Sequence, residues 1–268
     1  MKKNMSDKKT ALITGGTSGI GKELAKLFAN DGYDLILVAR GQQGLDETAA
    51  ELRQSGAEVT TISKDLSVKA QVFELCEEVN SLDVEIDTLV NNAGMGVYGL
   101  FKDNDIEREL EIINLNINAT VILTKHFVQQ MAVRGDGKVL NLGSIAGKVP
   151  GPWQAVYHAT KAFVLSFTTA VREEMEGSGI TFTALMPGIT DTDFFNKADM
   201  NNSKAIQDPS VKADPAEVAK DGYDALMAGD DRVISGVKNK MQVGMSNLMP
   251  DSAVAHNMYD QQKPVDHE

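Results

Sequence analysis

The stretch Ala11-Leu-Ile-Thr-Gly-Gly-Thr-Ser-Gly-Ile-Gly21 decides the fold, because a short apolar run leads through a glycine-rich turn into the helical pattern of residues 22–30. A glycine-rich turn between a strand and a helix lets the backbone approach a pyrophosphate closely. The helix N-terminus then offers free N–H groups and the positive end of its dipole to the anion. A plain tight turn is the alternative, since a glycine cluster alone is weak evidence.

Short apolar runs alternate with helical stretches from this turn to about residue 185. The strand-like runs are 11–14, 34–39, 58–62, 88–90, 138–142 and 180–185, and the helical stretches are 22–30, 45–55, 68–82, 106–134 and 155–177. This alternation predicts an α/β fold, a three-layer doubly wound parallel sheet with helices on both faces. Because no linker interrupts it, we expect one domain over residues 10–268, preceded by a flexible tail, residues 1–9.

The pattern changes after the last of these strands. Residues 189–212 are polar and contain Phe194 and Phe195, which is typical of a lid over a substrate cleft. The two rings could contact an apolar substrate or simply pack the lid. Trp153, between Ser144 and Tyr157, is a better candidate for the pocket wall, with simple packing as the alternative.

The C-terminal part is less regular. It contains a helical stretch at 215–227, a strand-like run at 232–235 and a variable, methionine-rich tail at 237–268. Met241, Met245 and Met249 are spaced by four, which favours one face of a helix. Such a pliable apolar surface would suit a pocket, a subunit interface or a peripheral membrane contact.

The charge balance excludes several classes of partner. The chain has 268 residues with 26 basic and 38 acidic side chains, a net charge of −12. So acidic a surface repels phosphate backbones and anionic membranes, so we expect no nucleic-acid partner. Cys76 is the single cysteine, and it stands with four scattered histidines that lack metal-ligand spacing, so we expect no metal site.

The N-terminus and the lone cysteine indicate the compartment. No apolar segment follows the basic N-terminus and no run approaches 18 apolar residues, so we predict neither a signal peptide nor a transmembrane segment. One cysteine cannot form an internal disulfide, which favours a reducing cytoplasm.

The end of the second strand bears on the choice of dinucleotide. An acidic residue there would bind a free ribose 2′-hydroxyl, but this run ends in Ala39-Arg40. The guanidinium of Arg40 could grip a 2′-phosphate through two hydrogen bonds, so NADP(H) is favoured and NAD(H) is possible. An ordinary solvated arginine is the alternative reading.

The stretch Tyr157-His-Ala-Thr-Lys161 is the sharpest chemical feature. It opens a predicted helix, so Tyr157 and Lys161 share one face. A nearby ammonium stabilises a phenolate, and we expect it to lower the tyrosine pKa from about 10 towards neutrality. Such a tyrosine exchanges a proton with a carbonyl or alcohol oxygen. Ser144 follows a strand at the same sheet edge and could polarise that oxygen, or it could cap a turn.

With these motifs, the sequence resembles a short-chain dehydrogenase/reductase of the compact type, a Rossmann-fold family. The resemblance extends from Thr10 to about Thr192, and its motifs appear in the family's order. They are Thr14-Gly15-(x)3-Gly19-Ile20-Gly21, Asp65-Leu66, Asn91-Asn92-Ala93-Gly94, Asn116, Ser144, Tyr157-(x)3-Lys161 and Pro187-Gly188.

The resemblance implies a role for each catalytic residue. Tyr157 would be the general acid/base, Lys161 would bind the nicotinamide ribose and tune Tyr157, and Ser144 would hold the substrate oxygen. Asn116 would hold a water that links Lys161 to solvent. We prefer Asn116 to Asn114 and Asn118 because Ala119 then falls at the family's small residue.

The resemblance also implies a set of cofactor contacts. They are Gly15, Thr17, Ser18, Gly19, Ile20 and Gly21 of the glycine loop, Arg40, Asp65, Leu66, Asn92, Ala93, Gly94, Tyr157, Lys161, Pro187, Gly188, Ile189 and Thr192. Ser18 stands where many NADP-dependent members carry a second basic residue, so the NADP prediction depends mostly on Arg40. Gly143 replaces a frequent serine before Ser144.

The function that follows is NADPH-dependent reduction of a ketone or aldehyde, or the reverse alcohol oxidation, on a small-molecule substrate. A non-catalytic dinucleotide sensor is the alternative, although such a sensor would be expected to lack the intact Tyr-Lys pair. A sugar-nucleotide epimerase or dehydratase usually needs a longer C-terminal part. The resemblance further implies a homodimer or homotetramer formed through residues 106–134 and 155–177.

Overall fold

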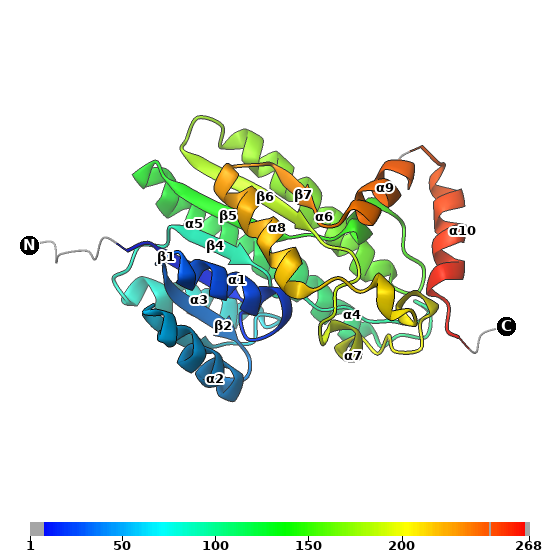
Figure 1. Cartoon of the computed structure of the whole chain (residues 1–268), viewed down its shortest axis with the longest axis horizontal. Helices are drawn as coiled ribbons and strands as arrows, with labels where there is room; N and C mark the ends of the chain where they lie inside the picture. Colours follow the sequence, from blue (N-terminus) through cyan, green and yellow to red (C-terminus); the bar gives the residue numbers. More distant parts are fainter. Residues whose placement is uncertain (1–7, 247, 266–268) are drawn as a thin grey trace, which may run out of the picture.

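The computed structural model describes residues 8–246 and 248–265, and a parallel sheet runs through its centre (Figure 1). Seven strands lie in the order β3-β2-β1-β4-β5-β6-β7, each parallel to its neighbours. Their bounds are β1 Thr10–Thr14, β2 Asp34–Ala39, β3 Val59–Ser63, β4 Thr88–Asn91, β5 Gly137–Leu142, β6 Ile180–Met186 and β7 Arg232–Ile234. The predicted doubly wound sheet is confirmed.

Helices cover both faces of this sheet (Figure 1). They are α1 Gly19–Asn30, α2 Gln42–Leu52, α3 Lys69–Ser81, α4 Ile106–Ile113, α5 Thr120–Arg134, α6 Ala155–Glu174, α7 Phe194–Lys197, α8 Pro215–Ala228, α9 Val237–Ser246 and α10 Asp251–Gln262. The helices between the first six strands lie within a few residues of the predicted stretches.

Alternation along the strands builds two cores, one on each face. In β1, Ile13 joins a fully buried cluster with Leu24 and Phe28 of α1 and residues of α2 and α8. Its neighbour Leu12 points the other way and joins Phe127 of α5 and residues of α3. Because both faces are covered, the strands read as continuous apolar runs rather than as alternating ones.

The predicted helix 106–134 follows one helical path, but its winding changes in the middle. Between α4 and α5, residues Asn114–Ala119 form the π-helical turn η2. Asp105 caps the start of α4 by accepting a hydrogen bond from the Glu107 N–H, and Gly135 ends α5 with a φ of 75°. A π turn accommodates an extra residue and often marks a functional position, and this one contains the candidate residue Asn116.

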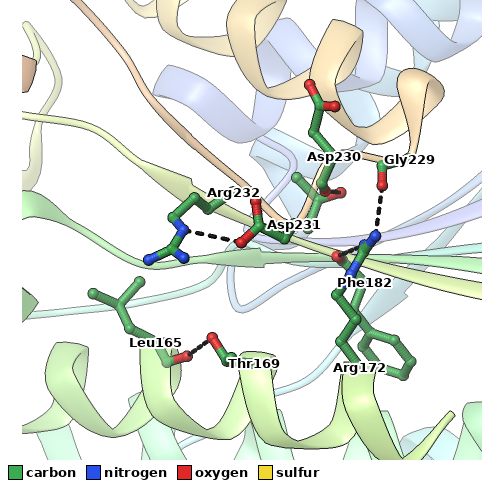
Figure 2. Close-up of polar contacts among 9 residues, drawn as sticks. Leu165, Thr169, Arg172, Phe182, Gly229, Asp230, Asp231 and Arg232 are labelled. Atoms are coloured by element: carbon green, nitrogen blue, oxygen red, sulfur yellow. Dashed lines mark hydrogen bonds and ion pairs between the residues drawn. The ribbon is translucent and has the colours of Figure 1, made fainter. Parts of the chain in front are cut away.

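Arg172 near the C-terminal end of α6 ties three elements together (Figure 2). Its guanidinium donates to the carbonyls of Phe182 in β6 at 2.7 Å and of Gly229 at 2.9 Å. Gly229 is the C-cap of α8, where unpaired carbonyls and the helix dipole favour a cation. This clamp fixes the far end of the helix whose first turn carries Tyr157.

The segments after β6 are short and irregular. Between β6 and α8 lie α7 and two single 3₁₀ turns, and an isolated bridge joins Ser203 to Pro264 beyond α10. The predicted lid therefore lies beside the C-terminal tail. Of the predicted N-terminal tail, residues 1–7 fall outside the part that the structure describes. Within residues 8–246 and 248–265, no helix is both long and apolar enough to span a membrane.

Candidate active site

A cavity of about 1390 Å³ opens at the carboxyl ends of the parallel strands. Crevices at this edge are the usual ligand sites of doubly wound sheets. Most of the predicted site residues line it: Gly15, Thr17, Ser18, Gly19, Ile20, Arg40, Asp65, Leu66, Asn92, Ala93, Gly94, Ser144, Tyr157, Lys161, Pro187, Gly188, Ile189 and Thr192. Gly21 and Asn116 do not line the cavity.

The glycine loop has a backbone that other residues would not adopt easily. Gly15 and Gly19 have φ values of 66° and 52°, and a Cβ on Gly19 would lie 2.8 Å from the Thr192 side chain. Ser18 is the N-cap of α1, but its side chain makes no capping hydrogen bond. The first N–H groups of α1 are therefore open to an anion, so this loop fits the pyrophosphate of a dinucleotide.

The side chain of Asn92 hydrogen-bonds to the backbone at the start of the glycine loop. Its side-chain amide donates to the carbonyls of Thr14 at 2.9 Å and Gly15 at 3.1 Å, and the Thr14 hydroxyl accepts from the Asn92 N–H. Gly21 lies against this amide, since a Cβ there would be 2.2 Å from Asn92 Nδ2. Gly21 is therefore a close-packing position behind the cavity wall, and its role as a cofactor contact stays a prediction.

The side chains of Arg40 and Asp65 lie near each other beyond the end of β2. Arg40 is exposed, and its Nη1 lies 4.0 Å from Asp65 Oδ2. Lys64 also lines the cavity, but it pairs with Glu74 at 3.1 Å and Glu78 at 3.4 Å. Arg40 is thus the more available cation for a ligand phosphate at this end.

The three candidate catalytic residues, Ser144, Tyr157 and Lys161, lie where α6 begins, close to the end of β5. Lys161 Nζ is 5.8 Å from the centre of the Tyr157 ring and donates to the Leu142 carbonyl at 2.7 Å. Ser144 Oγ accepts from the Ala146 N–H at 3.1 Å and donates to the Pro187 carbonyl at 3.3 Å. The tyrosine, lysine and serine that the sequence separates by up to 17 residues therefore line one space.

Burial dominates the electrostatics of this group. It raises the pKa of Tyr157 to about 12, against a hydrogen bond with Ser144 that lowers it. It lowers the pKa of Lys161 to about 8. The expectation that the lysine lowers the tyrosine pKa towards neutrality is wrong for the chain by itself, because loss of water disfavours both charged forms.

Asn116 acts behind the cavity. Its amide accepts from the Met95 N–H and donates to the Met95 carbonyl and to Thr160 Oγ1, each at 3.0 Å. Thr160 in turn donates to the Tyr157 carbonyl at 2.8 Å. Asn116 thus joins the loop after β4 to the first turn of α6, at the π-helical turn.

Aromatic side chains decide between the readings left open for the substrate side. Phe194 lines the cavity, and its ring lies 5.2 Å from that of Tyr157. Phe195 lines it too, and both rings also pack on the small apolar cluster of Ala198, Met200 and Ile206, so the two readings left open for these rings both hold. Trp153 is buried outside the cavity lining and packs on Tyr98 and Tyr259 at ring distances of 5.7 and 5.6 Å, so simple packing is the correct reading.

Several lining residues were missed by the sequence reasoning. They are Lys64, Met95, Gln154, His158, Met200 and Gln262, among others. Gln154 and His158 flank Tyr157 and could have been suspected from that position. Gln262 lies 105 residues after Tyr157 in an irregular tail, and no spacing in the sequence connects the two.

Comparison with known families agrees with this geometry. Residues 9–203 match the family model described as short chain dehydrogenase. The chain belongs to this family, which confirms the resemblance seen in its motifs, and it is an NAD(P)-dependent oxidoreductase acting on CH–OH or C=O groups.

Individual members of the family are similar to this chain over most of its length. It is 37% identical to sulfoacetaldehyde reductase 2 of Chromohalobacter salexigens over 71% of this chain and 75% of that protein. It is 32% identical to the ketoacyl reductase HetN of a Nostoc species over 67% of this chain and 63% of that protein, so it spans less than two thirds of this relative. A short-chain dehydrogenase of Sphingobium yanoikuyae in complex with NADPH superposes with a TM-score of 0.80 at 29% identity, covering 97% of this chain and 98% of that one.

Proposed function

We propose that the protein is an NADPH-dependent reductase of ketones or aldehydes that also catalyses the reverse alcohol oxidation. The observation that carries the proposal is one continuous cavity that holds both parts of such a site. The open N-terminus of α1 and the glycine loop lie in the same cavity as Ser144, Tyr157 and Lys161.

When bound, the nicotinamide supplies a hydride to the substrate carbon, and the chain handles the oxygen. The hydrogen bond from Ser144 to Pro187 is long at 3.3 Å, so a substrate oxygen competes well for this hydroxyl. Tyr157 keeps its proton at neutral pH because burial raises its pKa to about 12, and it donates that proton as the oxygen gains charge.

Lys161 stabilises the phenolate left after this transfer. Its pKa is lowered to about 8 by burial, so at neutral pH it is mostly charged, and its Nζ is 5.8 Å from the tyrosine ring. It would also hold the nicotinamide ribose. Asn116 is a positioning residue that fixes Thr160 and thereby the first turn of α6. The water relay through Asn116 stays a prediction.

The preference for NADP(H) rests on Arg40. It is exposed at the end of β2, no carboxylate of its own strand opposes a 2′-phosphate, and its contact with Asp65 is loose at 4.0 Å. The similarity to the structure of a short-chain dehydrogenase in complex with NADPH supports the same choice.

Three further proposals describe how the enzyme works as a whole. Residues 189–212 would act as a lid, with Phe194 against Tyr157 and the segment tied to the tail at Ser203. The chain would act as a single-domain homodimer or homotetramer in the cytoplasm. Its substrate would be a small carbonyl compound or alcohol.

The test measures NADPH oxidation by the wild-type protein with a panel of ketones and aldehydes. We expect turnover with at least one of them, and a fall of about 10²–10⁴-fold in kcat for Tyr157→Phe. Full turnover by Tyr157→Phe would overturn the assigned chemistry. NADPH binding without any turnover across the panel would favour the non-catalytic dinucleotide sensor.

A further inference from the structure

The last residue of α10 reaches into the substrate side of the cavity. The Gln262 carbonyl accepts hydrogen bonds from the Tyr98 hydroxyl and from Ser203 Oγ at 2.9 Å. The next residues pair with the lid, since the Lys204 N–H donates to the Lys263 carbonyl at 3.1 Å. The backbone of the tail is therefore anchored, and the Gln262 side chain points to a defined place beside His158.

The hydrogen bonds of His158 fix its tautomer. This buried ring places Nδ1 2.9 Å from the Val149 carbonyl, which can only accept, so Nδ1 carries the proton. Nε2 is then a lone-pair acceptor, and burial keeps the ring neutral by lowering its pKa. The group 3.3 Å from Nε2 is the Gln262 amide, which must present its Nε2–H to the ring.

This chain of bonds leaves the amide oxygen of Gln262 without a partner. Gln262 is only 5% exposed, and its Oε1 accepts no hydrogen bond from any residue that the structure describes. Gln154, also 5% exposed and three residues before Tyr157, has a buried Nε2 that likewise donates to none of them. Both glutamines line the cavity.

A buried polar atom without a protein partner is costly, so each of these two atoms is satisfied by a small polar group, such as a water or a ligand hydroxyl. One is an acceptor and the other is a donor. The lining side chains Phe194, Met200 and Met258 are apolar and can form no hydrogen bond with either atom. A hydroxyl is the smallest group that donates to an amide oxygen and accepts from an amide N–H.

We propose that the enzyme selects carbonyl substrates that carry a hydroxyl group apart from the reacting carbonyl, and that Gln262 and Gln154 recognise this hydroxyl. The inference rests on the proposed reductase function and deepens it. Sites built to hydrogen-bond a substrate hydroxyl discriminate strongly against analogues that lack it, because the polar groups of the protein then stay unpaired. The rest of the substrate would be apolar.

The experiment compares cyclohexanone with 3-hydroxy- and 4-hydroxycyclohexanone. For each ketone, kcat/KM is measured with NADPH, and Kd is measured by fluorescence quenching on the protein loaded with NADP⁺. The variants are Gln262→Met and Gln154→Met, which keep side-chain length and leave the backbone bonds of both residues in place. Gln43→Met, an exposed glutamine of α2, is the matched control.

We expect wild type and Gln43→Met to favour one hydroxylated ketone by about tenfold or more, in Kd and in kcat/KM. In Gln262→Met this ratio falls towards one, whatever the change in the constants for cyclohexanone. The ratio is the readout because a purely structural lesion would lower the values for all three ketones together.

The possible outcomes distinguish failure of the hydroxyl proposal from failure of the proposed reductase function. Equal constants for hydroxylated and plain ketones in wild type, or an unchanged ratio in Gln262→Met, would overturn the hydroxyl proposal and leave the reductase function standing. Selective binding of a hydroxylated ketone with no reduction would support the hydroxyl proposal as a binding preference and count against the reductase function.

Discussion

The cofactor side and the substrate side of the cavity are built in different ways. The cofactor side consists of the ends of β1, β2 and β4 and the start of α1, backed by two large cores of fully buried side chains. The substrate side consists of residues 193–211 and 251–265 and the loop around Tyr98. Its own core is small, with Ala198, Met200 and Ile206 at its centre.

The hydrogen bonds that stabilise the cofactor side and the substrate side of the cavity differ as well. On the cofactor side, glycines and sheet hydrogen bonds shape the backbone, and one asparagine, Asn92, ties the loops. On the substrate side, single side-chain groups such as the Tyr98 hydroxyl and Ser203 Oγ hold one carbonyl, that of Gln262. The rigid backbone of the cofactor side is suited to binding one fixed ligand such as a dinucleotide. The substrate side is suited to setting substrate specificity, because substitutions there can change the shape of the pocket without unfolding the sheet.

Removing the Ser144 hydroxyl tests the point where the two sides meet. We expect Ser144→Ala to lower kcat by about 10²-fold, because the substrate oxygen loses a donor as it gains charge. Steady-state kinetics with the best ketone of the panel measures the effect. Ser144→Thr keeps a hydroxyl and should recover part of the rate. Equal losses in both variants would point to the loop rather than to the hydroxyl.

A side chain in the glycine loop should damage the cofactor side alone. Gly19→Ala places a Cβ 2.8 Å from Thr192 Cγ2 on a backbone with a φ of 52°, so the loop must shift. We expect Kd for NADPH to rise at least about tenfold, by fluorescence titration, with the protein still folded. Gly244→Ala, which has no neighbour within 4 Å, is the control. Unaltered NADPH affinity in Gly19→Ala would mean that the loop is not the phosphate cradle.

Arg40 should decide between the two dinucleotides. We expect Arg40→Ala to raise Kd for NADPH about tenfold and to leave Kd for NADH within about twofold. Arg232→Ala, at another half-exposed arginine, serves as the control. If the wild-type protein binds NADPH and NADH with equal affinity, Arg40 does not select NADPH.

Two tyrosine hydroxyls offer a direct comparison of the sides. Tyr98→Phe removes a bond to the Gln262 carbonyl, and we expect KM for the ketone to rise about fivefold with kcat unchanged. Tyr223→Phe removes a hydroxyl bond to Asp31 on the far side of α1 and should leave both constants unaltered. A fall in kcat for Tyr98→Phe would show that this bond supports the chemistry rather than the pocket.

The smallest effect is a pH dependence of stability at Lys161. Its pKa is about 8 in the folded chain against an ordinary 10.5, so between these values the unfolded state binds more protons and stability rises with pH. In Lys161→Met this gain is absent. The Tm of the variant relative to wild type should therefore fall by roughly 2–5 °C between pH 7.5 and 10, by calorimetry. A constant difference would mean that the lysine is not desolvated.

Much of the cofactor side could be predicted from the sequence because it depends on local patterns. The glycine turn, the apolar strands and the Tyr-Lys spacing are readable along the chain, and the alternation of strands and helices predicts a parallel sheet. The electrostatics could not be read in this way. The pKa of Tyr157 depends on how much water the folded chain removes, which reverses the direction expected from Lys161 alone.

The substrate side depends on contacts between residues that are far apart in the sequence. The sequence by itself determined the family and the parallel sheet and indicated the candidate reacting groups, since these follow from short motifs with fixed backbone requirements. Only the tertiary structure decided that Trp153 packs outside the cavity and that Gln262 of the tail faces His158 inside it. Irregular segments carry no periodicity, so their partners are set by packing and hydrogen bonding in the folded chain.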